Sequence, residues 1–366
     1  MSVQKHKFFG VFVIGQVCCD RRGWFYRWIS LCACFTAFLL FMPGSAWAGL
    51  PGITPDNLAL IVNDEDPFSV RTAQRYQAER GIPPENVIHI RIKPVVSSID
   101  PAVFKRVKNE VDRRASAHIQ AYLLTWTLPY RVGCMSITSA FTFGYDTAFC
   151  AVGCRPTKPS PYFSSMSEAP FSDLGVRPSM MLAGIDEKQI DDLIDRGVRA
   201  DYTHPEGTAY LVTTGDKARS TRTPAFRKLA AEYTGDFPIR HLHIDALTEK
   251  RDVMLYFTGA TWVSGLDTLS FLPGAAADHL TSVGGVLDGI GQMSILRWIE
   301  AGATASYGAV IEPCNYPQKF PHPAIFIANY LRGESLIESY WKSVAWPGQG
   351  VFVGEPLARP FAQKPD

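Results

Sequence analysis

The sequence predicts an α/β protein with a mainly parallel sheet and helices on both faces of that sheet. Short apolar runs alternate along the chain with segments that carry helix start and stop signals. These runs are nearly continuous in apolar residues, which is typical of strands buried on both faces of a sheet. The 366 residues are 46% hydrophobic and 12% aromatic, so the chain has enough apolar side chains for a large core.

The alternation is clearest in the first part of the chain. Asp66 precedes a helical segment that Gly81 ends, and Asp100 with Pro101 opens a second helical segment. The order strand, helix, strand, helix, strand favours parallel pairing. The predicted strands are 58–63, 86–92 and 121–126, and the predicted helices are 67–80 and 101–115.

The same rhythm returns in the second part of the chain. The run "LSFLPG" (269–274) predicts a short strand that ends in a turn, followed by a helix that carries Asp278 and His279. The other predicted strands are 209–214, 239–244, 253–258 and 304–311. The other predicted helices run from 186 to 199, onward from Thr223, and over 294–302, 324–333 and 335–344.

Residues 129–180 break this rhythm. They hold six prolines and three cysteines among many Ser, Thr and aromatic residues. An irregular segment of this length is uncommon in a compact domain unless it is a lid, a binding loop or an insertion. We therefore expect a long Cys- and Pro-rich insertion here.

The first 48 residues have the features of a secretory signal peptide. Arg21, Arg22 and Arg27 precede an apolar stretch at 29–42, and small residues follow up to Ala48. Cleavage is predicted before Gly49, which leaves 49–366 as a single α/β domain without a stable membrane span. A membrane anchor is the alternative, but the apolar stretch is short of the roughly 20 residues that a span needs. "RRGWF" fits a loose twin-arginine pattern, so the export route is open. We expect a periplasmic or extracellular protein.

Four cysteines remain after this cleavage, Cys134, Cys150, Cys154 and Cys314. In an exported chain they are expected to form two disulfides, and three pairings are open. The spacing of Cys150 and Cys154 lacks the further Cys or His ligands of a zinc site, so no metal is predicted.

Charge and missing motifs exclude several classes of function. The net charge is +1, so no nucleic-acid partner is predicted. The sequence has no G-x-S-x-G, no P-loop, no H-E-x-x-H and no G-x-G-x-x-G after its first strand. These absences argue against common serine hydrolases, P-loop hydrolases, zinc peptidases and simple dinucleotide enzymes, and no cofactor is predicted.

The candidate site residues follow the ends of predicted strands, because ligands of open α/β sheets bind at the carboxyl ends. Acidic groups there could act as acid and base, although each also suits a helix cap or a turn, and His279 suits a buried structural role. Trp126 and Trp262 could form an apolar wall beside the small turn at Gly259, which leaves room for a ligand. The weak catalytic candidates are Asp64, Asp216, His279 and Glu312.

The order of motifs in the second half carries a resemblance. "LYFTGATW", "LSFLPG", "ILRWIEAGATASYGAV", "LRGESLIESYWKSV" and "VFVGEPLARPF" occur in an order similar to that of gingipain-type caspase-like cysteine peptidases. With "GIPPENV" and "LLTWTLPYR", most of residues 50–361 also resembles an uncharacterised family of exported bacterial proteins. The resemblance implies a caspase-like three-layer sandwich.

The same resemblance places the peptidase dyad on residues that cannot supply it. The general-base histidine of those peptidases falls on Gly259 or Ala260, and the nucleophilic cysteine falls among residues 272–274. A thiolate–imidazole mechanism needs both side chains, so cysteine peptidase activity is not expected.

Two functions remain as hypotheses. The first is an exported caspase-like scaffold with a binding or structural role, whose partner is an unknown ligand or an envelope protein. The second is a hydrolase that uses the Asp, Glu and His groups named above at the carboxyl ends of the strands.

Overall fold

The computed structural model describes residues 52–94, 96–289 and 291–364. These described residues form one compact unit. The predicted signal peptide lies outside the described residues. Among the helices that are described, none has the length and apolar character to cross a membrane.

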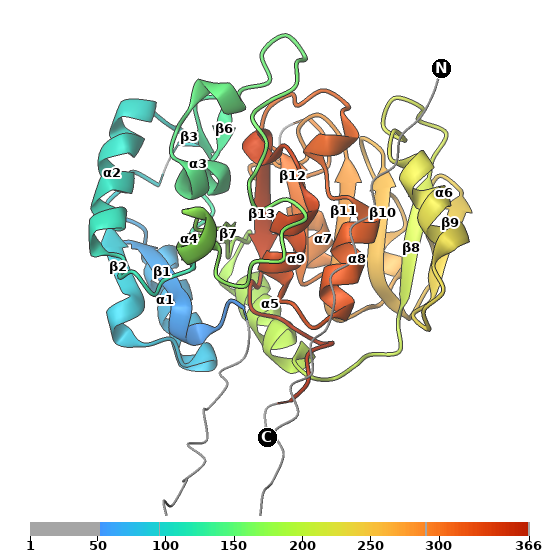
Figure 1. The fold of residues 1–366 in the computed structure, drawn as a ribbon, viewed down its shortest axis with the longest axis horizontal. Helices are drawn as coiled ribbons and strands as arrows, with labels where there is room; N and C mark the ends of the chain where they lie inside the picture. The colour runs from blue at the N-terminus through green and yellow to red at the C-terminus, as the bar shows by residue number, and fades with distance from the viewer. Residues whose placement is uncertain (1–51, 95, 290, 365–366) are drawn as a thin grey trace, which may run out of the picture. The chain divides into compact units, whose positions relative to one another are not determined.

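The molecule is organised around a ten-stranded, mainly parallel sheet (Figure 1). Its strand order is β2-β1-β4-β7-β13-β12-β11-β10-β8-β9. The strands of the first part of the chain pair in parallel with one another, as do those of the second part. Strand β13 (Gly350–Gly354) lies between the two groups and runs antiparallel to β12. The predicted fold class is therefore confirmed.

The first part of the sheet follows the predicted alternation of strand and helix. The side chain of Asp66 accepts a hydrogen bond from the backbone N–H of Phe68, and Gly81 ends the helix in the left-handed region with φ of 64°. Asp100 caps the next helix in the same way. The elements are β1 (Leu58–Asn63), α1 (Pro67–Arg80), β2 (Val87–Ile90), α2 (Pro101–Arg114), β4 (Ala121–Leu124) and β7 (Ser179–Met181).

The second part contains most of the remaining predicted elements at their expected places. They are α5 (Glu187–Ala200), β8 (Thr208–Thr213), α6 (Thr223–Glu232), β9 (Ile239–His243), β10 (Val253–Gly259), β11 (Phe271–Leu280), α7 (Leu296–Glu300), β12 (Ala305–Ala309), α8 (Pro323–Leu331) and α9 (Leu336–Ser343). Strand β13 was not predicted.

One prediction in this part was wrong, because residues 275–280 form a strand and not a helix. Strand β11 continues through Gly274 and three alanines to Leu280 and pairs with β10 and β12 on its two sides. Asp278 and His279 are thus strand neighbours that point to opposite faces of the sheet. The alanines favour a helix locally, but pairing on both sides overrides that preference.

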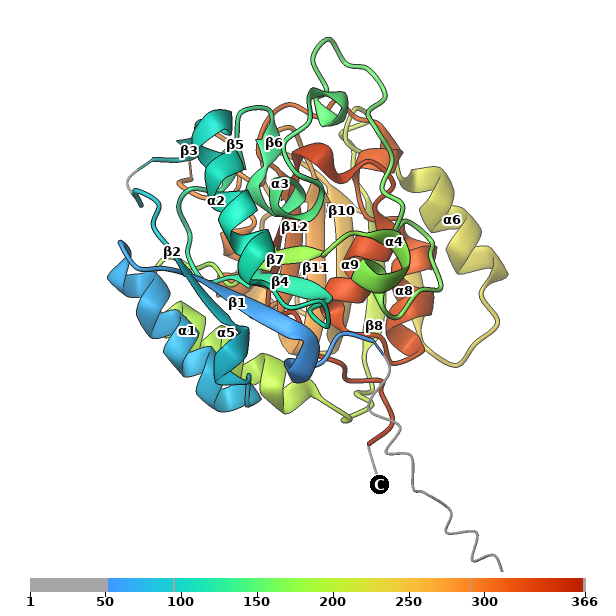
Figure 2. The same ribbon diagram turned by 60° about the vertical axis from the view of Figure 1, so that its left-hand side comes forward.

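Helices cover both faces of the sheet. Helices α1, α5 and α7 pack together on one face. The other face carries α2, α3 (Ile137–Phe143), α6, α8 and α9, which contact one another through pairs such as Phe104–Phe141 and Phe143–Trp341. Figure 2 shows α1 and α5 side by side, away from α3, α9 and α8.

The segment at 129–180 is less irregular than predicted. It holds β5 (Arg131–Val132), β6 (Met135–Ser136), α3, α4 (Pro170–Leu174) and β7, and β5 and β6 form a small second sheet with β3 (Ser98–Ile99). The long stretch without helix or strand is confined to residues 150–169.

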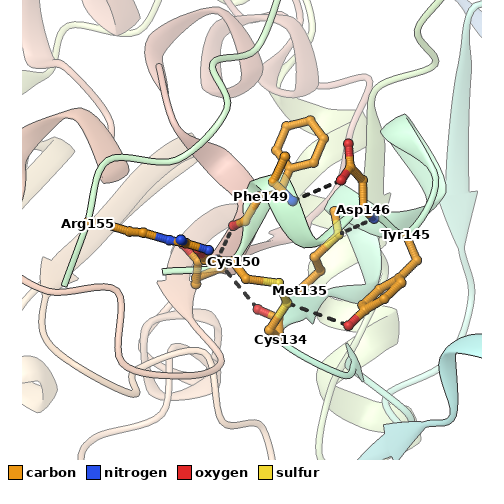
Figure 3. Close-up of a disulfide and its surroundings, with 9 residues drawn as sticks. Cys134, Met135, Tyr145, Asp146, Phe149, Cys150 and Arg155 are labelled. Carbon is orange, nitrogen blue, oxygen red and sulfur yellow. Dashed lines mark hydrogen bonds between the residues drawn. A yellow bond between two sulfur atoms is a disulfide. The ribbon is translucent and has the colours of Figure 1, made fainter. Parts of the chain in front are cut away.

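Two disulfides tie this segment down, as predicted for its cysteines. Cys134 bonds to Cys150 within the segment, beside Tyr145 and Arg155 (Figure 3). Cys154 bonds to Cys314, which follows β12.

Candidate functional site

The two parts of the sheet share one carboxyl edge. Asp66, Thr127 and Gly184 follow β1, β4 and β7, and they line the same cavity as Asp288, which follows β11. The hydroxyl of Tyr130, beyond β4, also lies 3.3 Å from the Asp288 carboxylate and donates to it. Strand ends that are far apart in sequence therefore meet at one edge, as the parallel topology requires.

The edge is too long for all the candidate acids to meet. β1 is the second strand in the sheet order and β8 is the ninth. Seven spacings of about 4.8 Å separate them by about 34 Å. Asp64 has a different partner, because its Oδ1 lies 2.6 Å from Nδ1 of the His89 ring. The structure does not bring Asp64 together with Asp216 or Glu312.

A cavity of about 250 Å³ lies at the ends of β8, β11 and β12. Arg219 is part of its lining, with Nη1 donating to Asp216 Oδ2 at 2.8 Å and Nε donating to Thr281 Oγ1 at 3.0 Å. Glu312 also lines the cavity and is exposed, and its Oε1 accepts from the backbone N–H of Cys314 at 2.6 Å. The remaining lining comes from Cys154, Ala218, Leu280, Ser282, Pro313, Cys314, Asn315 and Phe320.

One wall of this cavity is the Cys154–Cys314 disulfide. The Lys319 ammonium donates to the carbonyls of Arg155 and Pro313, the neighbours of the two cysteines in sequence. Burial lowers the pKa of Lys319 to about 8. The wall is therefore held by a covalent bond and by a buried amino group that bridges the same two segments.

The room expected at Gly259 is already occupied. A Cβ atom at this position would overlap the backbone carbonyl oxygen of Arg219. The hydroxyl of Thr214 also donates to the Gly259 carbonyl at 2.6 Å, which fastens the loop after β8 onto the end of β10. The expectation of free space for a ligand at this turn was wrong, because that loop fills the space.

The strand end to which the resemblance assigned a nucleophilic cysteine also lies elsewhere in the chain. Because β11 runs to Leu280, its carboxyl end is at Thr281 and Ser282 rather than at residues 272–274. Neither is a cysteine, and the Thr281 hydroxyl is already bonded to Gln292 Oε1 at 2.7 Å. The sequence located this strand end wrongly for the same reason that it predicted a helix there.

His279 is fully buried on the α7 side of the sheet. The Trp298 indole N–H donates to its Nδ1 at 2.9 Å, so the ring hydrogen is on Nε2 and donates to the Met293 carbonyl at 3.0 Å. Burial lowers its pKa to about 4. A neutral imidazole with both nitrogens engaged and no exposed atom has no route to a ligand in the cavity.

Asp278 forms a charged pair that the sequence did not reveal. Arg222 Nη2 donates to Asp278 Oδ1 at 2.5 Å and to the Thr258 carbonyl at 2.6 Å. Both side chains are almost completely buried, and burial raises the pKa of Asp278 while Arg222 opposes that rise. Had this strand been recognised in the sequence, its alternation would have placed Asp278 and His279 on opposite faces of the sheet.

The two candidate tryptophans differ. Trp126 is fully buried, donates to the Pro129 carbonyl at 3.0 Å and packs against Phe141, so it cannot stack on a ligand. Trp262 is 63% exposed beyond the end of β10, outside the lining of the 250 Å³ cavity. In the described part of the chain, no group of three or more His, Cys, Asp or Glu side chains could hold a metal ion.

Comparisons with known proteins add little. No family model matches the chain, and no curated protein matches it. Among solved structures, the chain is similar to one described as "Structure of Protease", with 10% sequence identity and a TM-score of 0.46. The similarity covers 84% of this chain and 79% of that chain. Identity and score are too low for this similarity to indicate an activity.

Proposed function

We propose that this chain is an exported binding protein on a caspase-like scaffold, without cysteine peptidase activity. Its ligand occupies the cavity at the ends of β8, β11 and β12. The observation that carries the proposal is the packing of the Arg219 carbonyl against Gly259. This contact occupies the position at which the resemblance places the general base of a peptidase.

The groups near the cavity support binding better than catalysis. Hydrolysis by general acid and base needs two titratable groups within reach of one substrate. Asp216 is held by Arg219, and His279 has no exposed atom. Of the four catalytic candidates, this leaves Glu312 without Asp216, His279 or the distant Asp64 as its partner.

The size and polarity of the cavity define the class of ligand. About 250 Å³ is small for a ligand site, which favours a small molecule. Arg219 and Asn315 offer N–H donors, and Glu312 offers carboxylate oxygens. A compact ligand with both an acceptor and a donor, such as an amino acid, fits this set of groups.

The first experiment tests the absence of peptidase activity. The purified mature protein is incubated with fluorogenic peptides that carry acidic, basic or apolar residues before the reporter, with and without a reducing agent. Ser282→Ala serves as the reference, because Ser282 stands at the carboxyl end of β11, the strand that would carry the nucleophile. We expect the unmodified protein to show no more turnover than this variant. Turnover that is lost in Ser282→Ala, or that appears on reduction, would contradict the proposal.

The second experiment tests binding. The shift in Tm is measured with a panel of the common amino acids for the unmodified protein, Glu312→Gln and the control Glu206→Gln. Glu206 is an exposed glutamate outside the cavity lining. We expect at least one amino acid to raise the Tm of the unmodified protein and of Glu206→Gln but not of Glu312→Gln. The same shift in all three proteins, or none in any, would reject this site.

A further inference from the structure

The first part of the sheet has a point where the strand order reverses. From β1 the chain moves to β2 on one side and then returns to β4 on the other side. Helices α1 and α2 consequently lie on opposite faces, and a crevice opens between the carboxyl ends of β1 and β4. A cavity of about 430 Å³ lies there, lined by residues that follow β1, β4 and β7.

This cavity has an apolar body. Leu287 and Leu296 are buried side chains, and Phe68 and Leu128 are partly buried. Ile185 is 64% exposed on the rim, although it is a large aliphatic residue. The volume lies within the range of about 300–1,000 Å³ that is typical of small-molecule sites.

The charged groups of the lining are carboxylates only. Asp66 and Asp288 are the charged residues in it, and neither forms an ion pair with another described residue. One Asp66 oxygen accepts from the Phe68 backbone N–H, and Asp288 accepts from the Tyr130 hydroxyl. A carboxylate has about four acceptor positions, so both retain capacity for a further donor.

The equivalent crevice in the second part of the sheet is closed. There the strand order reverses between β8 and β10. The loop after β8 fills that point through the contact between Arg219 and Gly259. An open crevice is thus not an automatic consequence of this topology. The first crevice is open because the loops around it leave the space between the strand ends unfilled.

We propose that the cavity between the ends of β1 and β4 binds a small organic cation with an apolar body. The ammonium or amidinium group lies between Asp66 and Asp288, and the apolar part contacts Phe68, Leu128 and Leu287. This site is separate from the cavity beside Arg219 and does not depend on the function proposed for it.

The test compares three probes of similar shape by isothermal titration calorimetry. 2-Phenylethylamine is cationic, 2-phenylethanol is neutral and 3-phenylpropionate is anionic. Both the amine and the alcohol can donate to the carboxylates, but only the ammonium adds a full positive charge, so we expect the amine to bind at least about tenfold more tightly. We expect the propionate to bind most weakly. Equal affinity for amine and alcohol would overturn the proposal.

Two variants and a control locate the site. Asp288→Asn removes the charge without touching the cap of α1, and we expect the affinity for the amine to fall at least about fivefold with that for the alcohol unchanged. Ile185→Lys adds a competing ammonium on the rim and should also weaken the amine. The control Asp236→Asn changes an exposed aspartate between α6 and β9. If Asp288→Asn and Ile185→Lys bind the amine as tightly as the control does, the amine binds elsewhere and the proposal is overturned.

Discussion

Gly259 decides whether the carboxyl end of β10 is open to a ligand or is filled by another part of the chain. The sequence correctly identified a glycine turn at the end of a strand, and its small side chains suggested free space. A glycine is equally suited to the close approach of another backbone, and here the loop after β8 makes that approach. Sequence alone cannot separate these two uses, because the neighbour comes from 40 residues earlier in the chain.

Gly259→Ala is predicted to destabilise the protein. The added methyl group meets backbone atoms that cannot rotate away, so the loop after β8 must shift, at a cost of about 1–3 kcal/mol. The matched control is Gly215→Ala in the same loop, whose Cβ would meet only the side-chain oxygen of Asp245 at 3.3 Å. Urea unfolding measures both. Equal stability of the two variants would contradict the tight contact.

His279 is predicted to make the protein less stable in mild acid. Its pKa of about 4 in the folded state lies below the usual 6.5. Between these values the unfolded chain binds a proton that the folded chain does not. The free energy of unfolding therefore falls as the pH drops from about 6.5 to 4, by about 3 kcal/mol from this residue, and the contribution is fully present above pH 6.5.

The comparison is with His279→Gln, whose amide can still accept from Trp298 and donate to Met293. Carboxylates contribute to acid destabilisation equally in both proteins, so the difference between them isolates the histidine. Urea unfolding at pH 7 and pH 4.5 should show a smaller loss for the variant. Parallel losses would mean that His279 is protonated in the folded protein.

At the scale of elements, local signals predicted well wherever they were strong. Asp66, Gly81 and Asp100 mark helix ends by their own side-chain and backbone chemistry, and the structure uses each of them in that way. β11 failed because Gly274 and the alanines after it carry no local strand signal, and only pairing on both sides makes them a strand. β7 was missed because it has only three residues, and β13 was missed because it begins and ends in glycine and pairs with strands that lie far away in sequence.

The two disulfides are predicted to differ in their contribution to stability. Cys154 and Cys314 are 160 residues apart, whereas Cys134 and Cys150 are 16 apart. Loop-closure entropy rises with the logarithm of this separation, so the longer loop is worth about 2 kcal/mol more. Cys154→Ala/Cys314→Ala should therefore unfold at lower urea than Cys134→Ala/Cys150→Ala without reductant. The reverse order would show that packing around the shorter loop outweighs chain entropy.

At the scale of the molecule, the sheet consists of two similar arrangements of strands, and β13, the last strand of the chain, lies between them. Each has a strand, a helix and an outer strand, and then returns to the inner side of its first strand. The sequence predicted the alternation but not this joining, because β13 comes last in the chain and lies between β7 and β12. The candidate acids follow strands of one sheet, but strand order, which sequence does not reveal, keeps Asp64 away from Asp216.

Strand β13 is predicted to make the two arrangements unfold together. Val353 is fully buried opposite Ser306 of β12 and Met181 of β7, and Glu355 just beyond it accepts from Arg80 of α1. A proline in this central strand cannot donate to the ladder, so it removes a hydrogen bond between β13 and a neighbouring strand. Hydrogen exchange of Val353→Pro should therefore show protection falling together in β1 and in β10, while Gln363→Pro, in the exposed tail, leaves both unchanged.

Because β13 contacts both groups of strands, the unmodified protein should also melt in a single calorimetric transition. Loss of protection in one group alone, or two separate transitions, would mean that each arrangement folds independently and that β13 only docks on them.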